Sequence, residues 1–205
     1  PWPSRHLLRG EQLASMRADS LLLNASRGEV IDGAALQALL AQGRGPRTAL
    51  DVWEGEPHIS SDLLQEVSLG TPHIAGYSLD GKLRATRMLY RSAREFLGLP
   101  APDIPAASAV APPYSPPAQL RGADLVRHLL RLHYDVREDD LALRGATVDA
   151  DPELAARAFD QLRRHYPERR ELRGMPVCCN ALAPRERALV AGLGCASITA
   201  GATAI

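Results

Sequence analysis

Short apolar runs alternate with a helical pattern in the first half of the chain. The apolar runs at 20–24 and 48–52 have the length of strands, and the segment 32–42 between them has leucines at helical spacing. Asp32 is a favourable N-cap for this helix, and Gly43 is a favourable stop. The order strand, loop, helix, strand, loop predicts a parallel α/β sheet, whose functional groups gather on loops at the carboxyl ends of the strands.

The second half of the chain opens with a long helical pattern and a run of prolines. Residues 79–97 place apolar side chains at helical spacing, and four arginines line much of one side: Arg84, Arg87, Arg91 and Arg94. Such a face is either a phosphate site or, more commonly, a solvated basic surface. Seven prolines lie within 99–117, which predicts a stiff, extended linker.

The remaining residues alternate between helical and strand patterns. Helices are expected at 120–134, 152–166 and 184–191, and short strands at 175–179 and 196–199. These segments contain no constellation of catalytic residues. An assembly module therefore fits this part of the chain better than a second active site.

Composition limits the class of protein. Hydrophobic residues make up 45% of the 205 residues, which supports a buried core, and 24 basic residues balance 24 acidic ones. The balanced charge gives no electrostatic footprint for nucleic acid or an anionic membrane, and the apolar runs fall far short of the ~20 residues of a membrane span. Three cysteines, all late in the chain, and no metal-binding spacing of cysteine and histidine indicate a reduced, cytoplasmic protein without a metal site.

Three loops that follow predicted strands hold the residues suited to catalysis. Arg27 lies after the first strand, Glu56 after the second, and His73 in the third loop. An arginine fork can hold a carboxylate or a polarised carbonyl, and an imidazole can move a proton near neutral pH. A carboxylate on the other imidazole nitrogen fixes the tautomer and favours the imidazolium. A hydride acceptor is the fourth part that such a constellation needs.

The sequences of these loops resemble a known family. Asn-Ala-Ser-Arg-Gly at 24–28, Ala-Leu-Asp-Val-Trp-Glu-Gly-Glu-Pro at 49–57 and Thr-Pro-His-Ile-Ala-Gly at 71–76 are similar to motifs of the NAD-dependent D-2-hydroxyacid dehydrogenases. The resemblance implies that NAD is the cofactor. It also implies a set of site residues: catalytic Arg27, Glu56 and His73; cofactor-binding Ala25, Ser26, Arg27, Asp51 and Gly76; and substrate-binding Arg27 and Tyr77.

Three of these assignments have alternatives. Glu54 competes with Glu56, which is preferred because the family places its carboxylate immediately before a proline. Asp51 is either an acceptor for the nicotinamide amide or a capping or turn residue. Tyr77 either binds the substrate's phosphate or hydroxyls, or is a packed tyrosine.

The end of the chain narrows the resemblance within the family. Tyr77 and the segments 129–140 and 166–171 resemble the sequences of one branch of the family. Members of that branch oxidise a phosphorylated hydroxy acid in pyridoxal phosphate synthesis, and they have an added C-terminal dimerisation domain. The implied fold class is α/β, with the C-terminal part of a Rossmann-like parallel-sheet NAD-binding domain and then a small α/β dimerisation domain. The expected boundaries are 1–78 for the NAD-binding part, 79–98 for a helix returning to the substrate domain, 99–117 for the linker and 118–205 for the dimerisation domain.

A glycine loop for the pyrophosphate of the cofactor is absent from this sequence. No Gly-x-Gly-x-x-Gly follows a strand, and the Gly-x-Gly at 192–194 follows a helical pattern. We therefore expect the C-terminal part of a longer, homodimeric enzyme that is inactive by itself. Two alternatives are another D-2-hydroxyacid dehydrogenase, such as one acting on phosphoglycerate, and a non-catalytic interaction remnant; Tyr77 and the C-terminal module argue against the first.

Overall fold

The computed structural model describes residues 3–100 and 112–198. Packing divides the chain into two compact units, the first made of residues 1–76 and 136–167 and the second of residues 77–135 and 168–205. The chain therefore leaves the first unit after Gly76 and returns to it for two helices.

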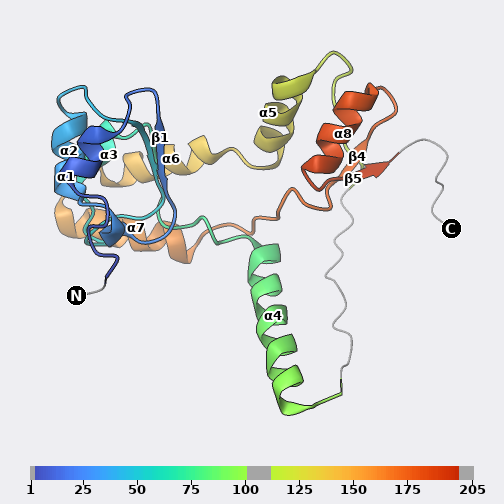
Figure 1. Cartoon of the computed structure of the whole chain (residues 1–205), viewed down its shortest axis with the longest axis horizontal. Coiled ribbons are helices and arrows are strands. Elements are labelled where there is room, and N and C mark those ends of the chain that lie inside the picture. The colour runs from blue at the N-terminus through green and yellow to red at the C-terminus, as the bar shows by residue number, and fades with distance from the viewer. Residues whose placement is uncertain (1–2, 101–111, 199–205) are drawn as a thin grey trace. The chain divides into compact units, whose positions relative to one another are not determined.

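A three-stranded parallel sheet forms the centre of the first unit (Figure 1). Its strands are β1 (Leu21–Asn24), β2 (Arg47–Leu50) and β3 (Leu69–Gly70), in that spatial order. The parallel α/β fold predicted from the alternating patterns is confirmed. The helical segments between the strands and before them are α1 (Gly10–Ser15), the 3-10 turn η1 (Gly28–Val30), α2 (Gly33–Leu40) and α3 (Ser61–Glu66).

Side-chain caps determine where two of these helices begin. Asp32 caps α2 as predicted, because its carboxylate accepts a hydrogen bond from the Ala35 amide at 2.9 Å. Ser60 caps α3, because its hydroxyl accepts a hydrogen bond from the Leu63 amide at 3.1 Å. Both caps fix the residue at which the preceding loop ends.

Two further helices pack into the first unit from far along the chain. Helices α6 (Val136–Thr147) and α7 (Pro152–Arg164), yellow and orange in Figure 1, lie beside the sheet and its helices. Leu143 and Phe159 are fully buried in the same core as the leucines of α2 and α3. Helix α6 is not among the predicted elements, and the segment 118–205, expected as one module, contributes to both units. The domain boundaries themselves stay a prediction.

A two-stranded parallel sheet lies in the second unit. Strand β4 (Pro176–Cys178) pairs with β5 (Ala196–Ile198), and helices α5 (Gly122–His133) and α8 (Pro184–Gly192) pack with them. These elements lie close to their predicted positions, and the predicted last strand residue, Thr199, falls outside the described residues. Their core consists of Leu125, Leu129, Val177, Cys179, Leu182, Val190 and Cys195.

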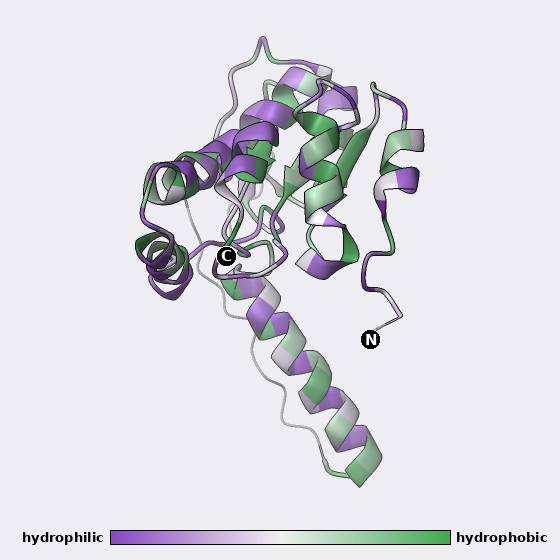
Figure 2. Ribbon diagram, turned by 90° about the vertical axis from the view of Figure 1, so that its left-hand side faces the viewer, coloured by the Kyte–Doolittle hydropathy of each residue, from purple (hydrophilic) through white to green (hydrophobic). Residues whose placement is uncertain are grey.

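Helix α4 (Leu79–Leu97) is the longest described helix, and none of its residues is buried. Its exposed apolar residues include Met88, Leu89 and Phe96. Figure 2 shows hydrophobic residues in green and hydrophilic ones in purple along this helix. The predicted helix is confirmed, whereas its return to a substrate domain stays a prediction. Most of the predicted linker at 99–117 lies outside the described residues.

Candidate active site

Three loops at one edge of the first sheet carry most of the predicted site residues. The segments 25–28, 51–56 and 71–76 follow β1, β2 and β3 respectively. Because the strands are parallel and adjacent, their carboxyl ends meet at the same edge of the sheet. The topology therefore brings Arg27, Glu56 and His73 to one side of the first unit.

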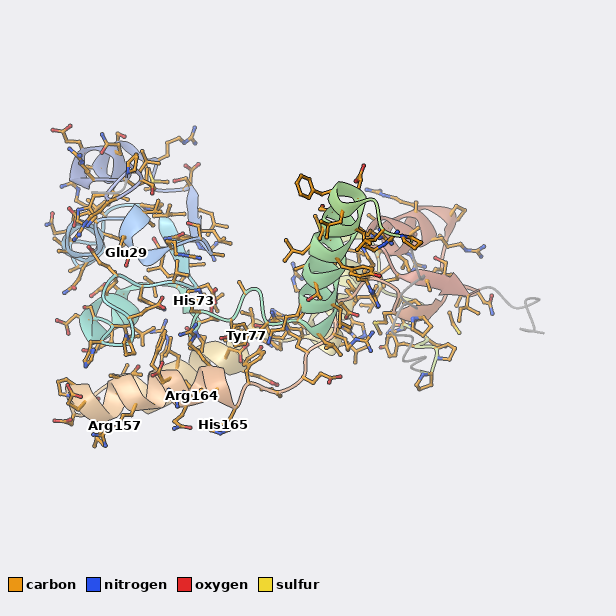
Figure 3. The ribbon with its side chains drawn as sticks, turned by 90° about the horizontal axis from the view of Figure 1, so that it is seen from below. Glu29, His73, Tyr77, Arg157, Arg164 and His165 are labelled. Carbon is orange, nitrogen blue, oxygen red and sulfur yellow. The ribbon has the colours of Figure 1, made fainter. Side chains whose placement is uncertain are left out.

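Glu56 and His73, the latter labelled in Figure 3, form the central hydrogen bond at this edge. His73 Nδ1 lies 2.7 Å from Glu56 Oε2, and Glu56 Oε1 accepts a hydrogen bond from the Trp53 amide at 2.8 Å. The side chains of His73 and Glu56 are 30% and 19% exposed, so the pair is shielded but reachable. Because an ionised carboxylate only accepts hydrogen bonds, Nδ1 carries the proton and Nε2 is left for a ligand. The catalytic role of the pair stays a prediction.

Asp51 organises the loop that carries His73. Its buried carboxylate accepts hydrogen bonds from the Thr71 hydroxyl at 2.7 Å and from the amides of Ile74 and Ala75 at 2.8 and 3.0 Å. The His73 amide donates to the Asp51 carbonyl oxygen at 2.7 Å, and His73 has a φ of 56°. A non-glycine residue holds such a left-handed conformation only when its surroundings enforce it. These bonds favour the turn role of Asp51, and its contact with nicotinamide stays a prediction.

The first loop is built on the buried side chain of Asn24. Its Oδ1 accepts hydrogen bonds from the Ser26 amide at 3.1 Å and the Ser26 hydroxyl at 2.7 Å, and its Nδ2 donates to the Arg27 carbonyl at 2.9 Å. Ala25, Ser26 and Arg27 are exposed, and Arg27 Nη1 donates to the Ser26 carbonyl at 2.7 Å. The loop therefore presents its three predicted ligand-binding residues outward from a fixed base.

Gly28 lets the first loop touch the second. A Cβ at Gly28 would lie 2.1 Å from both the carbonyl carbon and the carbonyl oxygen of Trp53, so glycine alone fits this backbone. The buried Trp53 indole donates to the Thr71 carbonyl at 2.9 Å and thus links the second loop to the third. Neither Asn24 nor Trp53 is among the predicted site residues, although both lie inside the family-like motifs.

Glu54, the alternative to Glu56, has other partners. Its Oε1 lies 2.7 Å from His6 Nε2 and 3.4 Å from Arg5 Nη2, and its Oε2 accepts a hydrogen bond from the Gly33 amide at 3.3 Å. Glu54 therefore binds the amide at the start of α2 and two side chains of the segment that precedes α1. The geometry favours Glu56 as the partner of His73.

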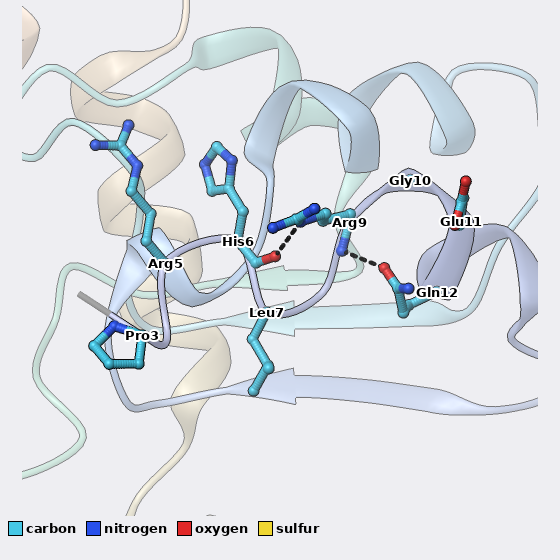
Figure 4. A pocket seen from close by; sticks show the side chains of 8 residues that line it. All are labelled: Pro3, Arg5, His6, Leu7, Arg9, Gly10, Glu11 and Gln12. Carbon is cyan, nitrogen blue, oxygen red and sulfur yellow. Dashed lines mark hydrogen bonds between the residues drawn. The ribbon is translucent and has the colours of Figure 1, made fainter. Parts of the chain in front are cut away.

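A pocket of about 490 Å³ adjoins the residues that bind Glu54 (Figure 4). Its walls include Arg9, whose side chain donates to the His6 carbonyl at 3.2 Å and whose amide donates to Gln12 Oε1 at 3.1 Å. None of the predicted site residues lines this pocket, so it is not the candidate active site. The lining residues are Pro3, Arg5, His6, Leu7, Arg9, Gly10, Glu11 and Gln12.

Gly76 and Tyr77 are divided between the two units. Gly76 is exposed at the end of the first unit, and a Cβ there would meet nothing within 4 Å, so a ligand has access to its backbone. Tyr77 begins the second unit, where Lys82 Nζ lies 4.3 Å from its ring centroid. The substrate-binding role of Tyr77 stays a prediction.

Charged residues at the start of α4 form a network within the second unit. Asp80 accepts two hydrogen bonds from Arg170 at 2.9 Å, and Glu171 accepts from Arg84 at 2.6 Å and from Ser78 at 3.0 Å. Arg170 holds the pKa of Asp80 below its ordinary value, and Arg84 does the same for the pKa of Glu171. Because Arg84 is engaged by Glu171, the basic side of α4 fits a structural and solvated surface better than a phosphate site.

The described residues hold no group of three or more His, Cys, Asp or Glu side chains that could bind a metal ion. Cys178, Cys179 and Cys195 are free thiols, and burial raises the pKa of Cys195. No described helix combines the length and apolar character that crossing a membrane requires.

Comparison with known proteins gives two domain matches and many relatives of one activity. Residues 3–75 match the D-isomer specific 2-hydroxyacid dehydrogenase, NAD binding domain, and residues 115–194 match a domain of unknown function. The chain is 47% identical over 178 residues to an erythronate-4-phosphate dehydrogenase of Marinobacter nauticus, covering 85% of this chain and 46% of that protein. It is 44% identical over 196 residues to the one of Azotobacter vinelandii, covering 94% and 51%. The chain thus spans about half the length of these relatives.

Among solved structures, a glyoxylate reductase from Paecilomyes thermophila is 28% identical, with a TM-score of 0.42. The similarity covers 46% of this chain and 29% of that chain.

Proposed function

We propose that this chain, whose residues 3–75 match the D-isomer specific 2-hydroxyacid dehydrogenase, NAD binding domain, supplies the acid–base pair of an NAD-dependent erythronate-4-phosphate dehydrogenase. The full-length enzyme would oxidise the C2 hydroxyl of 4-phosphoerythronate to a 2-oxo acid. The observation that carries the proposal is the 2.7 Å hydrogen bond between Glu56 and His73 at the carboxyl edge of a parallel sheet.

His73 is the proposed general base. With Nδ1 bonded to Glu56, Nε2 takes the proton of the substrate hydroxyl, and Glu56 stabilises the imidazolium that forms. The Trp53 amide holds the second oxygen of Glu56 and so fixes the carboxylate's direction. Arg27 binds the substrate carboxylate and the forming carbonyl oxygen through its planar fork of donors. In the direction of reduction, the protonated His73 returns the proton.

When bound, NAD would supply the acceptor for the hydride from C2. The residues proposed to hold it are on the three loops at the sheet edge where parallel α/β folds bind dinucleotides. Two observations support that fit: Ala25 and Ser26 are exposed, and Gly76 leaves its backbone open to a ligand. Arg27 and Asp51 complete the proposed set.

We also propose that the enzyme is a cytoplasmic homodimer that works in pyridoxal phosphate synthesis. Support for self-association comes from Leu130 and Leu132, large apolar side chains that α5 exposes on two different sides, because residues two apart on a helix do not share a face. Two-fold pairing is the commonest oligomer geometry. Light scattering of the full-length enzyme should give twice the mass of one chain, and Leu130→Glu with Leu132→Glu should give the monomer mass. Unchanged dimers in that double variant would show that neither side chain lies in the interface.

Replacement of His73 by Gln in the full-length enzyme tests the proposed function. Loss of a general base should lower kcat for 4-phosphoerythronate by roughly 10²- to 10⁴-fold. His58→Gln is the matched control, because His58 also pairs with a glutamate, Glu153 at 3.2 Å, but is exposed outside the candidate site. Equal rates for the two variants would refute the assignment, as expected for a non-catalytic interaction module.

Glu56→Gln tests the role of the carboxylate. Because the amide keeps the shape and loses the charge, the imidazolium of His73 loses its stabilisation. In the full-length enzyme, kcat for oxidation and for reduction should both fall, and reduction, which starts from the imidazolium, should lose more. Normal rates in both directions would remove Glu56 from the mechanism.

A further inference from the structure

Helix α6 contacts the strand that leads into the His73 loop. Asp140 Oδ1 accepts a hydrogen bond from the Gly70 amide at 2.7 Å, although the two residues are 70 positions apart. Gly70 ends β3, the outer strand of the sheet, and the next amide, that of Thr71, donates inward to Leu50 of β2 at 2.9 Å. Since successive amides of a strand point to opposite sides, Asp140 satisfies the donor on the open side of β3.

Arg144 fixes the segment just before β3. Its Nη1 donates to the Leu64 carbonyl at 2.5 Å and its Nη2 to the Val67 carbonyl at 2.9 Å, which are orphan acceptors at the end of α3. Its Nε lies 3.0 Å from both oxygens of Asp140. One guanidinium therefore joins the end of α3 to the carboxylate that holds β3.

The pair is shielded from solvent and anchored by packing. The side chains of Asp140 and Arg144 are 14% and 25% exposed, against 40% and 71% for Asp160 and Arg164 at the same spacing on α7. Leu143, between the two residues of the α6 pair, is fully buried in the core of the first unit. Shielded charged hydrogen bonds of this kind are stronger than exposed ones.

The loop that follows β3 needs anchors because His73 has a left-handed backbone, with a φ of 56°. Asp51 provides the inner anchor through Thr71, Ile74 and Ala75. Asp140 holds the residue immediately before that loop from the other side. We propose that Asp140 and Arg144 are positioning residues for His73, through which helix α6 sets the direction of the imidazole toward its substrate. The proposal rests on the proposed function in that His73 is the base.

Histidine resonances of this 205-residue chain provide the first test. The ring signal of His73, assigned by its loss in His73→Gln, should move or broaden in Asp140→Ala, while the signal of His6, in the same unit, should stay. Asp140→Asn should restore most of the wild-type signal, because its amide oxygen can still accept the Gly70 hydrogen bond. Asp160→Ala is the matched control, because it removes an aspartate from an Asp–Arg pair on the neighbouring helix and should leave His73 unchanged.

The full-length enzyme provides the second test. A displaced catalytic group lowers the rate steeply, so Asp140→Ala should reduce kcat roughly tenfold to hundredfold, with KM changed less than about twofold. Arg144→Lys, which keeps the charge and loses the fork, should act in the same direction if Asp140→Ala does not fold.

A His73 signal and kcat that match wild type in both Asp140→Ala and Arg144→Lys would overturn the inference. An active His73→Gln enzyme would overturn the proposed function instead, and the effect of Asp140→Ala on the His73 signal would still decide the positioning role.

Discussion

Replacing Gly28 by alanine should separate the first two loops of the candidate site. The added Cβ would lie 2.1 Å from the Trp53 carbonyl group and 2.5 Å from the Glu54 amide nitrogen. An ordinary contact begins at 3.4 Å, so the loops must move apart by about 1.3 Å. Because the opposing atoms are backbone, no side-chain rotation can relieve the overlap.

The size of the effect follows from that displacement. Over-packing costs about 1–3 kcal/mol, and contact with backbone favours the upper value. At roughly 2–4 °C per kcal/mol for a chain of this length, 3 kcal/mol lowers Tm by roughly 6–12 °C. The Trp53 amide also holds Glu56, so the Glu56–His73 pair should move as well. A shift near 1 Å in a catalytic group can lower the rate by about 10²-fold.

Thermal unfolding of the 205-residue chain, followed by circular dichroism, measures the stability, and kcat of the full-length enzyme measures the displacement. Gly145→Ala is the matched control: Gly145 lies in α6, and a Cβ there meets nothing within 4 Å. That variant should keep or raise Tm, since alanine favours a helix over glycine by about 0.5–1 kcal/mol. A Gly28→Ala chain as stable as Gly145→Ala would refute the close approach of the two loops.

Three further changes test other parts of the structure. Arg27→Lys in the full-length enzyme keeps the charge but loses the planar fork. Because two charged hydrogen bonds contribute about 1.5–3 kcal/mol each, kcat/KM should fall by roughly two orders of magnitude or more. A loss below about threefold would place Arg27 outside the site. Asp80→Asn should lower Tm near neutral pH. Because the pKa of Asp80 is depressed in the folded protein, its carboxylate stabilises the fold above the carboxyl's ordinary pKa of about 4, and this stabilisation is lost as pH falls through the folded value. A Tm difference between variant and wild type that does not shrink in acid would contradict this. Leu143→Ala should cost about 2–5 kcal/mol in urea unfolding of the chain, and a smaller loss than exposed Leu141→Ala would show that α6 is not part of the core.

The sheet was open to prediction because it depends on short-range patterns. Apolar strand runs fix where β1 and β2 end, and parallel topology then places the loops at one edge. The choice of Glu56 over Glu54 came from family resemblance, and sequence spacing alone could not exclude Glu54. The structure separates them by contacts with residues far away: Glu54 binds His6, and Glu56 binds His73.

Helix α6 could not be predicted with its partners, because its contacts have no local signature. After Val136, the large apolar residues of its sequence are only Leu141 and Leu143. The two differ in burial, because Leu141 is exposed and Leu143 is fully buried. The Asp140–Arg144 pair reads as a surface i,i+4 ion pair, which is its commonest meaning. Only the return of the chain to the first unit turns these residues toward Gly70 and the end of α3.

The contacts of the candidate site also divide the proposed reaction into two requirements. Proton transfer depends on Glu56, His73 and the groups that hold them, and those contacts lie within the first unit of this chain. Hydride transfer depends in addition on holding the cofactor's pyrophosphate, for which this sequence has no Gly-x-Gly-x-x-Gly loop. Orientation of the two reactants accounts for roughly 7–11 kcal/mol of such a barrier. The Glu56–His73 pair therefore serves only the proton-transfer part of the proposed reaction, and hydride transfer requires in addition that the cofactor be held in register with it.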